Sequence, residues 1–427
     1  MKGFTKNTGA KKVVIPALIV LLIALLCACS SQDMLISLEE SILQIAVEST
    51  PAPPDREFSE RLNLYYSHLT ADERDIYAQF VEAAESMQTE FVPCHSILHD
   101  HLDLIYAAVC YDQVQLFWLD EHCSCLYAEG TGEITEIQMH YTVTVDELPI
   151  YQECLETAAQ TYLDAATGLN TEERERVIHD LLCQNIRYDT GMPTTQSVYN
   201  ALVDGYTACA GFARAFRYLM TELDIPCCLC FGQGYGGDSD SGYTWGDHAW
   251  NIIRLGDSWY NVDVTWDTTS MSPAGLISYA FYNRTDEDFS EKHIRDSSLE
   301  FLPACTATEY SCENLYGWAP ELMFAEQLGI QTLTDVYSLQ DYYDACLLTL
   351  KESGGGQSET AMLVHGESCL DAITDAINSQ EYKDAYIADA LRYLDWNGCS
   401  FHLETRTFQA KDEVYLFVQY NTLTAAE

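Results

Sequence analysis

A cysteine, a histidine and an aspartate follow one another at a spacing that suits thiol chemistry. Cys209 stands at the expected start of a helix that ends by Pro226, and His248 and Asp263 lie in the two expected strands that follow. A helix N-terminus favours a thiolate, because its unpaired N–H groups stabilise negative charge. In such a site an imidazole takes and returns the proton, while a carboxylate orients the ring. The sequence therefore predicts Cys209 as nucleophile, His248 as base and Asp263 as orienting acid.

Strand periodicity gives this prediction a geometric requirement. A two-residue turn at Gly256-Asp257 sets His248 opposite Thr265. Asp263 then shares a face with Thr265, and so with His248, as a diagonal neighbour with Cβ atoms roughly 7 Å away. A three-residue turn would move Asp263 to the opposite face. Each residue alone also has an ordinary interpretation, as a buried thiol, a packed histidine or a surface carboxylate.

Three further residues are candidates for the site. The backbone N–H of Cys209 is a natural donor to an oxyanion, and Gln196 is our candidate for a second donor, with a solvated loop residue as the alternative. Trp250 and Trp266 could wall a substrate cleft, although packing in the core is the other interpretation. We expect no metal and no cofactor, because the Cys94, His95, His99 and His101 group lacks a second ligand pair at zinc spacing.

The elements that must position these residues belong to an α+β chain. Helical periodicity covers 172–186 and begins again near Cys209, and strand patterns cover 227–232, 249–255 and 259–266. The acidic, glycine-rich run from Gly234 to Gly242 lacks the glutamate of a calcium loop, so we interpret it as a flexible loop beside His248. The predicted organisation is a signal peptide (1–28), a tether (29–57), a small α+β domain (58–145), a catalytic domain (146–300), a linker (301–327) and a small α+β domain (328–427).

A set of short motifs resembles the transglutaminase-like superfamily, whose members share a papain-like core. The resemblance runs from about Val177 to Thr269 and is carried by the runs around Tyr188, Tyr199, Cys209, Ile225-Pro226, His248 and Asp263. It implies that Cys209 is the nucleophile, His248 the base and Asp263 the orienting residue. The sequence departs from the family at Ala210 and in Tyr206-Thr-Ala208, which bears on substrate entry and leaves the three residues intact.

The N-terminus and the charge indicate where such a domain would work. Residues 1–12 are basic, 13–26 are apolar, and Leu26-Cys-Ala-Cys29 resembles a bacterial lipobox, so we expect a lipid anchor on Cys29; an uncleaved signal anchor is the alternative. Either way the body faces out of the cell. With 66 acidic against 21 basic residues, the net charge of −45 disfavours nucleic acid and favours a basic substrate.

Together these features predict a surface lipoprotein carrying a thiol enzyme that acts on protein or peptide amide bonds through a thioester. We expect hydrolysis, with protein cross-linking as one alternative. A binding or adhesion protein that keeps the fold without turnover is the other alternative. The 17 cysteines permit disulfides without requiring them, because the chain is long enough to bury a core and many thiols could simply be buried.

Overall fold

The computed structural model describes residues 51–189, 196–238, 242–268, 277–316, 327, 333–353, 358–379, 400–410 and 413–423. The predicted signal peptide and the predicted lipidated Cys29 lie outside these residues. Within them, no helix is long and apolar enough to cross a membrane. The chain divides into two compact units, one of residues 1–60 with 65–145 and one of residues 61–64 with 146–427.

The first unit is a helical pair beside a small sheet. Helix α4 (Ala71–Glu85) begins at a capping box, in which Thr70 accepts a hydrogen bond from the backbone N–H of Glu73 and the Glu73 carboxylate accepts one from that of Thr70. It follows the short α3 (Leu64–Ser67) and packs on α5 (His99–Asp112). The antiparallel sheet has the order β1-β3-β2, with β1 at Glu90–Phe91, β2 at Ser124–Tyr127 and β3 at Ile134–Gln138.

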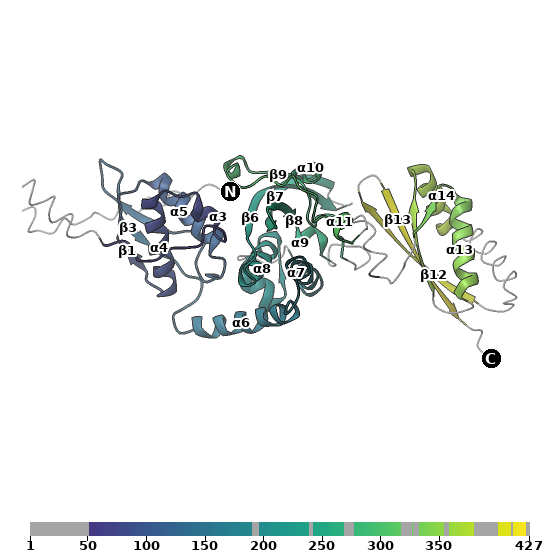
Figure 1. The fold of residues 1–427 in the computed structure, drawn as a ribbon, viewed down its shortest axis with the longest axis horizontal. Coiled ribbons are helices and arrows are strands. Elements are labelled where there is room, and N and C mark those ends of the chain that lie inside the picture. Colours follow the sequence, from purple (N-terminus) through teal and green to yellow (C-terminus); the bar gives the residue numbers. More distant parts are fainter. Residues whose placement is uncertain are drawn as a thin grey trace, which may run out of the picture. The chain divides into compact units, whose positions relative to one another are not determined.

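The second unit opens with helices that cover one side of an antiparallel sheet. Helices α6 (Leu148–Ala165) and α7 (Thr171–Asn185) precede α8 (Cys209–Glu222), and Figure 1 shows α7 and α8 together on one side of the strands. Between α7 and α8 lie β4 (Arg187–Tyr188), a π-helical turn η1 (Asn200–Asp204) and β5 (Tyr206–Thr207), and β4 pairs with β5 in parallel.

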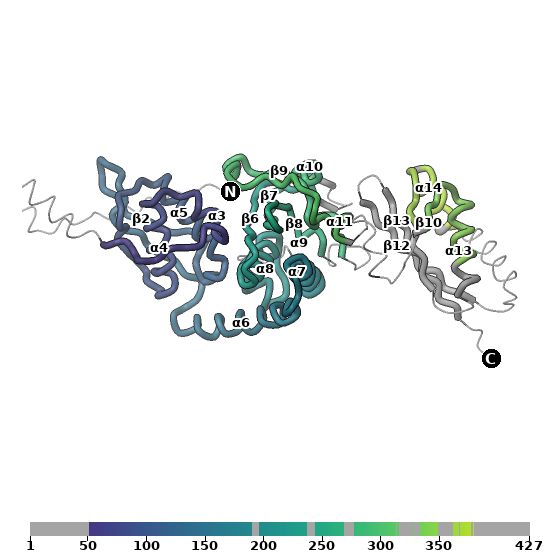
Figure 2. Tube along the Cα trace, viewed as in Figure 1, coloured from purple at the N-terminus to yellow at the C-terminus, as the bar shows by residue number. Residues whose placement is uncertain are grey.

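The sheet of this unit has the strand order β8-β7-β6-β9. Its strands are β6 (Cys227–Asp238), β7 (Gly242–Leu255), β8 (Ser258–Val262) and β9 (His293–Arg295). Short helices α9 (Val264–Asp267), α10 (Asp286–Phe289), η2 (Ser297–Leu299) and α11 (Cys312–Tyr316) connect and follow them, and Figure 2 traces this path from teal to green. The papain-like α+β architecture predicted from the sequence is therefore observed.

The core of this unit lies between α8 and the sheet. Phe212, Phe216 and Leu219 of α8 are fully buried, as are Cys228 and Ile252 on the strands. Burial of each large apolar side chain contributes about 1.5 to 3 kcal/mol, so this contact fixes the helix against the strands. Cys209, Cys227 and Cys230 are thiols outside any disulfide bond.

The last part of the chain forms a mixed sheet of its own with two helices. The sheet has the order β10-β11-β13-β12, and only β10 and β11 pair in parallel. The elements are β10 (Leu333–Val336), α13 (Leu339–Ser353), β11 (Ser358–Val364), α14 (Glu367–Asn378), β12 (Ser400–Ala410) and β13 (Glu413–Leu423). The helical patterns of residues 338–351 and 369–377 and the strand patterns of 361–365 and 414–420 predict α13, α14, β11 and β13.

Three local predictions were wrong. The sequence pattern of residues 115–119 predicts a strand, but these residues form turns, in which the Leu119 N–H donates to the Leu116 carbonyl, and only Leu119 makes an isolated bridge, to Tyr141. The flexible loop expected after Gly234 is instead strand on both arms of the β6–β7 hairpin, as far as Asp238 and from Gly242. The strand expected through Trp266 ends at Val262.

Candidate active site

Cys209 is the first residue of helix α8. The preceding Ala208 is extended and offers no side-chain cap, so the first turn takes its acceptor from elsewhere in the chain. The Gln196 Oε1 accepts a hydrogen bond from the backbone N–H of Ala210 at 2.8 Å and lies 3.8 Å from the Cys209 Sγ. The partly exposed thiol therefore lies at a helix N-terminus whose N–H groups favour negative charge.

Two close contacts fix the position of α8. A Cβ atom at Gly211 would lie 1.9 Å from the Thr207 Oγ1, so only glycine allows the helix to approach β5 this closely. On the other side, the buried Asn251 of β7 donates from Nδ2 to the Ala213 carbonyl of α8 at 3.0 Å and to the Cys228 carbonyl of β6 at 3.3 Å. These contacts place the start of α8 relative to the strand that carries the histidine.

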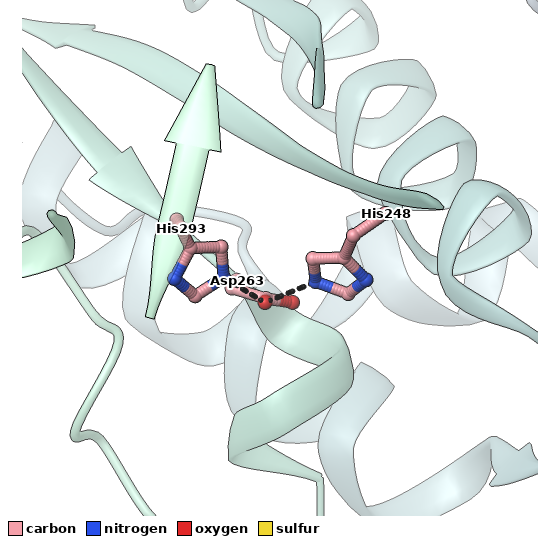
Figure 3. Close-up of side chains that lie close together, drawn as sticks. All are labelled: His248, Asp263 and His293. Atoms are coloured by element: carbon pink, nitrogen blue, oxygen red, sulfur yellow. Dashed lines mark hydrogen bonds and ion pairs between the residues drawn. The ribbon is translucent and has the colours of Figure 1, made fainter. Parts of the chain in front are cut away.

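His248 and Asp263 form a short buried hydrogen bond. The distance between the His248 Nε2 and the Asp263 Oδ2 is 2.6 Å, and Figure 3 shows the second ring nitrogen directed away from the carboxylate. Since Nε2 is occupied, Nδ1 is the nitrogen available to the Cys209 sulfur, which also interacts with this ring. The structure thus brings together the three residues that the sequence predicted.

The predicted register of the hairpin explains how His248 and Asp263 meet, although the pairing expected beyond Val262 is not observed. The Gly256-Asp257 turn has two residues, and Asn251 opposes Val262, as the prediction required. The predicted opposition of His248 and Thr265 was wrong, because β8 ends at Val262 and Asp263 becomes the N-cap of α9. The Asp263 side chain accepts hydrogen bonds from backbone N–H groups of the next turn. These bonds replace strand pairing and start a helix where the strand was expected to continue.

The Asp263 carboxylate accepts hydrogen bonds from four donors. Oδ1 accepts from the backbone N–H groups of Thr265 at 3.0 Å and Trp266 at 3.3 Å. Oδ2 accepts from His248 and also from His293 Nε2 at 3.0 Å. Asp263 is 1% exposed, so these donors replace the water that an ionised carboxylate would otherwise bind.

His293 is the site residue that the sequence analysis missed. It opens the three-residue strand β9, where it pairs with Gly234 of β6, and it is 4% exposed. Figure 3 shows its ring on the far side of Asp263 from His248. The strand is too short for a periodic signal, and its pairing with β6 is distant in sequence, so nothing in the local pattern marks this histidine as a site residue.

The two histidines differ in their protonation. Burial opposes the charge on His248, but the charge and hydrogen bond of Asp263 outweigh it and raise the pKa of His248 to about 10. Burial lowers the pKa of His293, and its hydrogen bond to Asp263 does not restore the ordinary value. Burial also disfavours the Asp263 carboxylate, but the charge and hydrogen bond of His248 and the hydrogen bond of His293 lower the pKa of Asp263 well below its usual range. At neutral pH an imidazolium, a carboxylate and a neutral imidazole therefore lie side by side.

The other predicted residues occupy distinct positions. Gln196 lies against Cys209, and its side-chain oxygen contacts the first turn of α8. Trp250 is 2% exposed and donates from Nε1 to the Asn261 Oδ1 at 3.1 Å, a position typical of core packing. Trp266 is partly exposed, with its ring centroid 5.1 Å from that of His248.

Glycines on β6 make room for this tryptophan. A Cβ atom at Gly234 would lie 3.0 Å from the Trp266 ring and 3.1 Å from the His248 Cβ, and one at Gly236 would lie 3.5 Å from the same ring. A larger residue at Gly234 would therefore push the Trp266 ring or His248 out of place. Residues 234–238 of the glycine-rich run, predicted as a loop, instead belong to strand β6 next to the site.

His248, Asp263 and His293 are also a group that could hold a metal ion. One ligand atom from each lies within 4.8 Å of the others, and two imidazoles with a carboxylate suit several divalent cations. Both Nε2 atoms already bond to the same carboxylate oxygen, so a cation there would have to displace the proton of His248. Such an ion would compete with the acid–base role of that ring.

Comparison with known proteins finds a family whose model matches the part of the chain that carries this site. Residues 158–264 match the family described as the Transglutaminase-like superfamily, and this range contains Cys209, His248 and Asp263. The chain carries a transglutaminase-like domain. Kyphoscoliosis peptidase of Mus musculus is 29% identical to it over 140 residues, and that of Homo sapiens is 28% identical over 140 residues. Each match covers 29% of this chain and 21% of the relative, so the chain spans about a fifth of these proteins.

Solved structures resemble part of the chain more distantly. The periplasmic domain of TgpA from Pseudomonas aeruginosa, bound to ethylmercury, is 14% identical, with 32% of this chain and 61% of that chain covered and a TM-score of 0.23. A structure described as a TGase is 11% identical, with 41% and 50% covered and a TM-score of 0.24. Similarity at this level supports no inference about activity.

Proposed function

We propose that the transglutaminase-like domain is a thiol enzyme that cleaves amide bonds of proteins or peptides. The observation that carries this proposal is the bond between the His248 Nε2 and the Asp263 Oδ2, at 2.6 Å, which leaves Nδ1 to the thiol of Cys209 at the start of α8. A nucleophile, a base and an orienting acid in mutual contact are the parts that acyl transfer requires. The relatives that match 140 residues of this chain are named peptidases, in agreement with this class of reaction.

The geometry supports the following sequence of steps. The Cys209 thiol transfers its proton to the His248 Nδ1, and its sulfur attacks the amide carbon, so that a carbon–sulfur bond forms as the carbonyl oxygen takes up negative charge. The amine leaves with the proton from the His248 Nδ1, and a thioester remains on Cys209. Water then attacks the thioester, His248 accepts its proton, and the carboxylic acid departs as the thiol is restored.

We assign the developing oxyanion to donors at the start of α8. The backbone N–H of Cys209 is one donor, and the amino group of Gln196 is the second, because this side chain already lies against the sulfur and the next peptide group. Asp263 keeps the His248 ring oriented throughout and stays ionised, since it has four hydrogen-bond donors of its own.

Water as the acceptor is favoured over an amine by the exposure of the segment next to the base. Residues 244–247, which lead into His248, are exposed to solvent, so water reaches this edge of the site. The net charge of −45 favours basic peptides as substrates. We further propose that the domain works outside the cell on a lipid anchor at Cys29. Cross-linking of proteins is the second candidate reaction, because the same thioester can be resolved by an amine.

Alkylation by iodoacetamide tests whether Cys209 is activated. Rapid labelling of one cysteine, identified as Cys209 by peptide mapping and lost in His248→Ala, is the expected result. Cys154→Ala is the matched control, because Cys154 is also a partly exposed helical thiol and should not affect the rapid phase. Slow labelling that does not depend on His248 would contradict the proposal and would favour a binding protein that retains the fold.

A second assay separates the two reactions. The protein is incubated with basic, neutral and acidic peptides, with and without a primary amine, and Cys209→Ala serves as the blank. We expect cleavage of the basic peptides with little incorporation of the amine. Dominant amine incorporation would instead assign the domain to cross-linking.

A further inference from the structure

His293 contacts the acid of the site in the same way as the base does. Its Nε2 lies 3.0 Å from the Asp263 Oδ2, the same oxygen that His248 contacts at 2.6 Å. Figure 3 shows the two rings on opposite sides of this carboxylate. The second histidine thus touches the orienting acid directly, and its ring centroid lies 5.3 Å from that of the base.

The surroundings of His293 hold its ring in one orientation. Its ring centroid lies 4.4 Å from that of Trp266 and 4.4 Å from that of Phe289, with Trp250 and Phe281 at 5.1 and 5.3 Å. The backbone is fixed by the pairing of β9 with β6. A ring enclosed in this way can present Nε2 to Asp263 without the entropy cost of a mobile side chain.

The other nitrogen of this ring shows which form is present. The His293 Nδ1 is buried and has no hydrogen-bond partner among the described residues. Protonation would place a charged N–H there without an acceptor, whereas a neutral ring leaves only a lone pair unpaired. The His248 ring differs in this respect, because its Nδ1 faces Cys209. The charged groups next to His293 are Asp263, His248 and Lys292, and the remaining contacts are aromatic.

We propose that His293 is a fourth residue of the site, a positioning residue that acts as a neutral Nε2–H donor to Asp263 and so holds the carboxylate in the plane of His248. This inference rests on the proposed thiol chemistry. Asp263 Oδ1 is held by backbone N–H groups, and Oδ2 would have His248 as its single donor among the described residues if His293 were absent. The carboxylate would then turn more freely, and the His248 ring would lose its fixed orientation toward the sulfur.

Two substitutions separate the donor from the space it fills. His293→Phe keeps a flat ring in the aromatic enclosure and removes the donor, whereas His293→Gln loses the ring and keeps a neutral N–H at a comparable distance from the backbone. We expect kcat/KM, or the rate of Cys209 alkylation, to fall about tenfold in His293→Phe and to be largely restored in His293→Gln, since a hydrogen bond to a charged group contributes about 1.5 kcal/mol or more.

The outcomes distinguish this inference from the proposed function. If the wild-type thiol is activated in a His248-dependent way and His293→Phe is as fast as the wild type, the positioning role is refuted and the thiol enzyme remains. If His293→Phe and His293→Gln lose the same rate while both keep the wild-type stability in urea, the positioning role is refuted too, because the donor would then be irrelevant. If the wild-type thiol is slow and independent of His248, the proposed function itself fails.

A measurement on the wild-type protein avoids substitution altogether. Nitrogen-15 NMR of labelled histidine side chains reports the protonation of each ring nitrogen. We expect His293 to be neutral with its proton on Nε2 at pH 7, next to a charged His248. A proton on the His293 Nδ1 at this pH would overturn the proposal.

Discussion

Gly232 is the residue whose substitution should test the link between strand β9 and the site most directly. A Cβ atom added at Gly232 would lie 1.9 Å from the carbonyl oxygen of Ile294, 2.9 Å from its carbonyl carbon and 3.0 Å from the Arg295 Cα. All three are backbone atoms of β9, so no side chain can turn aside to make room. The Gly232→Ala substitution must therefore displace the strand that carries His293.

The size of the displacement follows from these contacts. Real Cβ atoms essentially never approach a heavy atom within 3.0 Å, so β9 must retreat by about 1.1 Å from β6. The flanking bonds, Asp296 N–H to the Phe231 carbonyl at 2.9 Å and Tyr235 N–H to the Lys292 carbonyl at 2.8 Å, would lengthen beyond hydrogen-bonding range. With about 1 kcal/mol for each lost bond and the usual cost of overpacking, we expect the free energy of unfolding to fall by about 2 to 4 kcal/mol.

Gly246→Ala provides the matched control. Gly246 lies on β7 and, from the pairing of the strands, on the same face as Gly232, but a Cβ atom there would meet nothing within 4 Å. Urea unfolding measures the stability of both variants, and iodoacetamide labelling of Cys209 measures the site. Gly232→Ala should lose both stability and rate, with the rate falling about tenfold as His293 leaves Asp263. If both variants unfold within about 0.5 kcal/mol of each other, the close packing of β6 on β9 is refuted.

Two further outcomes follow from the electrostatics and packing of the site. Since the pKa of His248 is raised from 6.5 to about 10, its pair with Asp263 stabilises the fold fully below pH 6.5 and loses this contribution as the pH rises through 10. At about 1.4 kcal/mol for each pKa unit, the stability difference between wild type and His248→Gln should shrink by roughly 5 kcal/mol over that range in urea unfolding, and a constant difference would contradict it. Trp250→Phe removes the buried hydrogen bond to Asn261, so the free energy of unfolding should fall by about 1 to 2 kcal/mol. The KM for peptides should stay unchanged. A raised KM would instead show that Trp250 contacts substrate.

Much of the site was predictable because its signals are local. The start of α8 at Cys209 follows from a helical pattern bounded by Gly205 and Pro226. The approach of His248 to Asp263 follows from the length of one turn and the two-residue period of strands, and the observed register agrees with it. The departure at Asp263 is also local, since this aspartate caps a helix and the strand therefore ends at Val262, four residues before the predicted end at Trp266.

Local signals in the chain identify which three side chains could do chemistry, their order, and the face of the hairpin on which two of them meet, because turns and periodicity act over a few residues. The return of His293, 30 residues beyond Asp263, to the same carboxylate oxygen depends instead on contacts between distant parts of the chain. That contact depends on an edge strand of three residues and on Gly232, which has no side chain to keep the strands apart. The folded structure also sets which histidine is charged, because the charge of each ring depends on what its second nitrogen faces. His248 faces a thiol, and His293 faces aromatic rings.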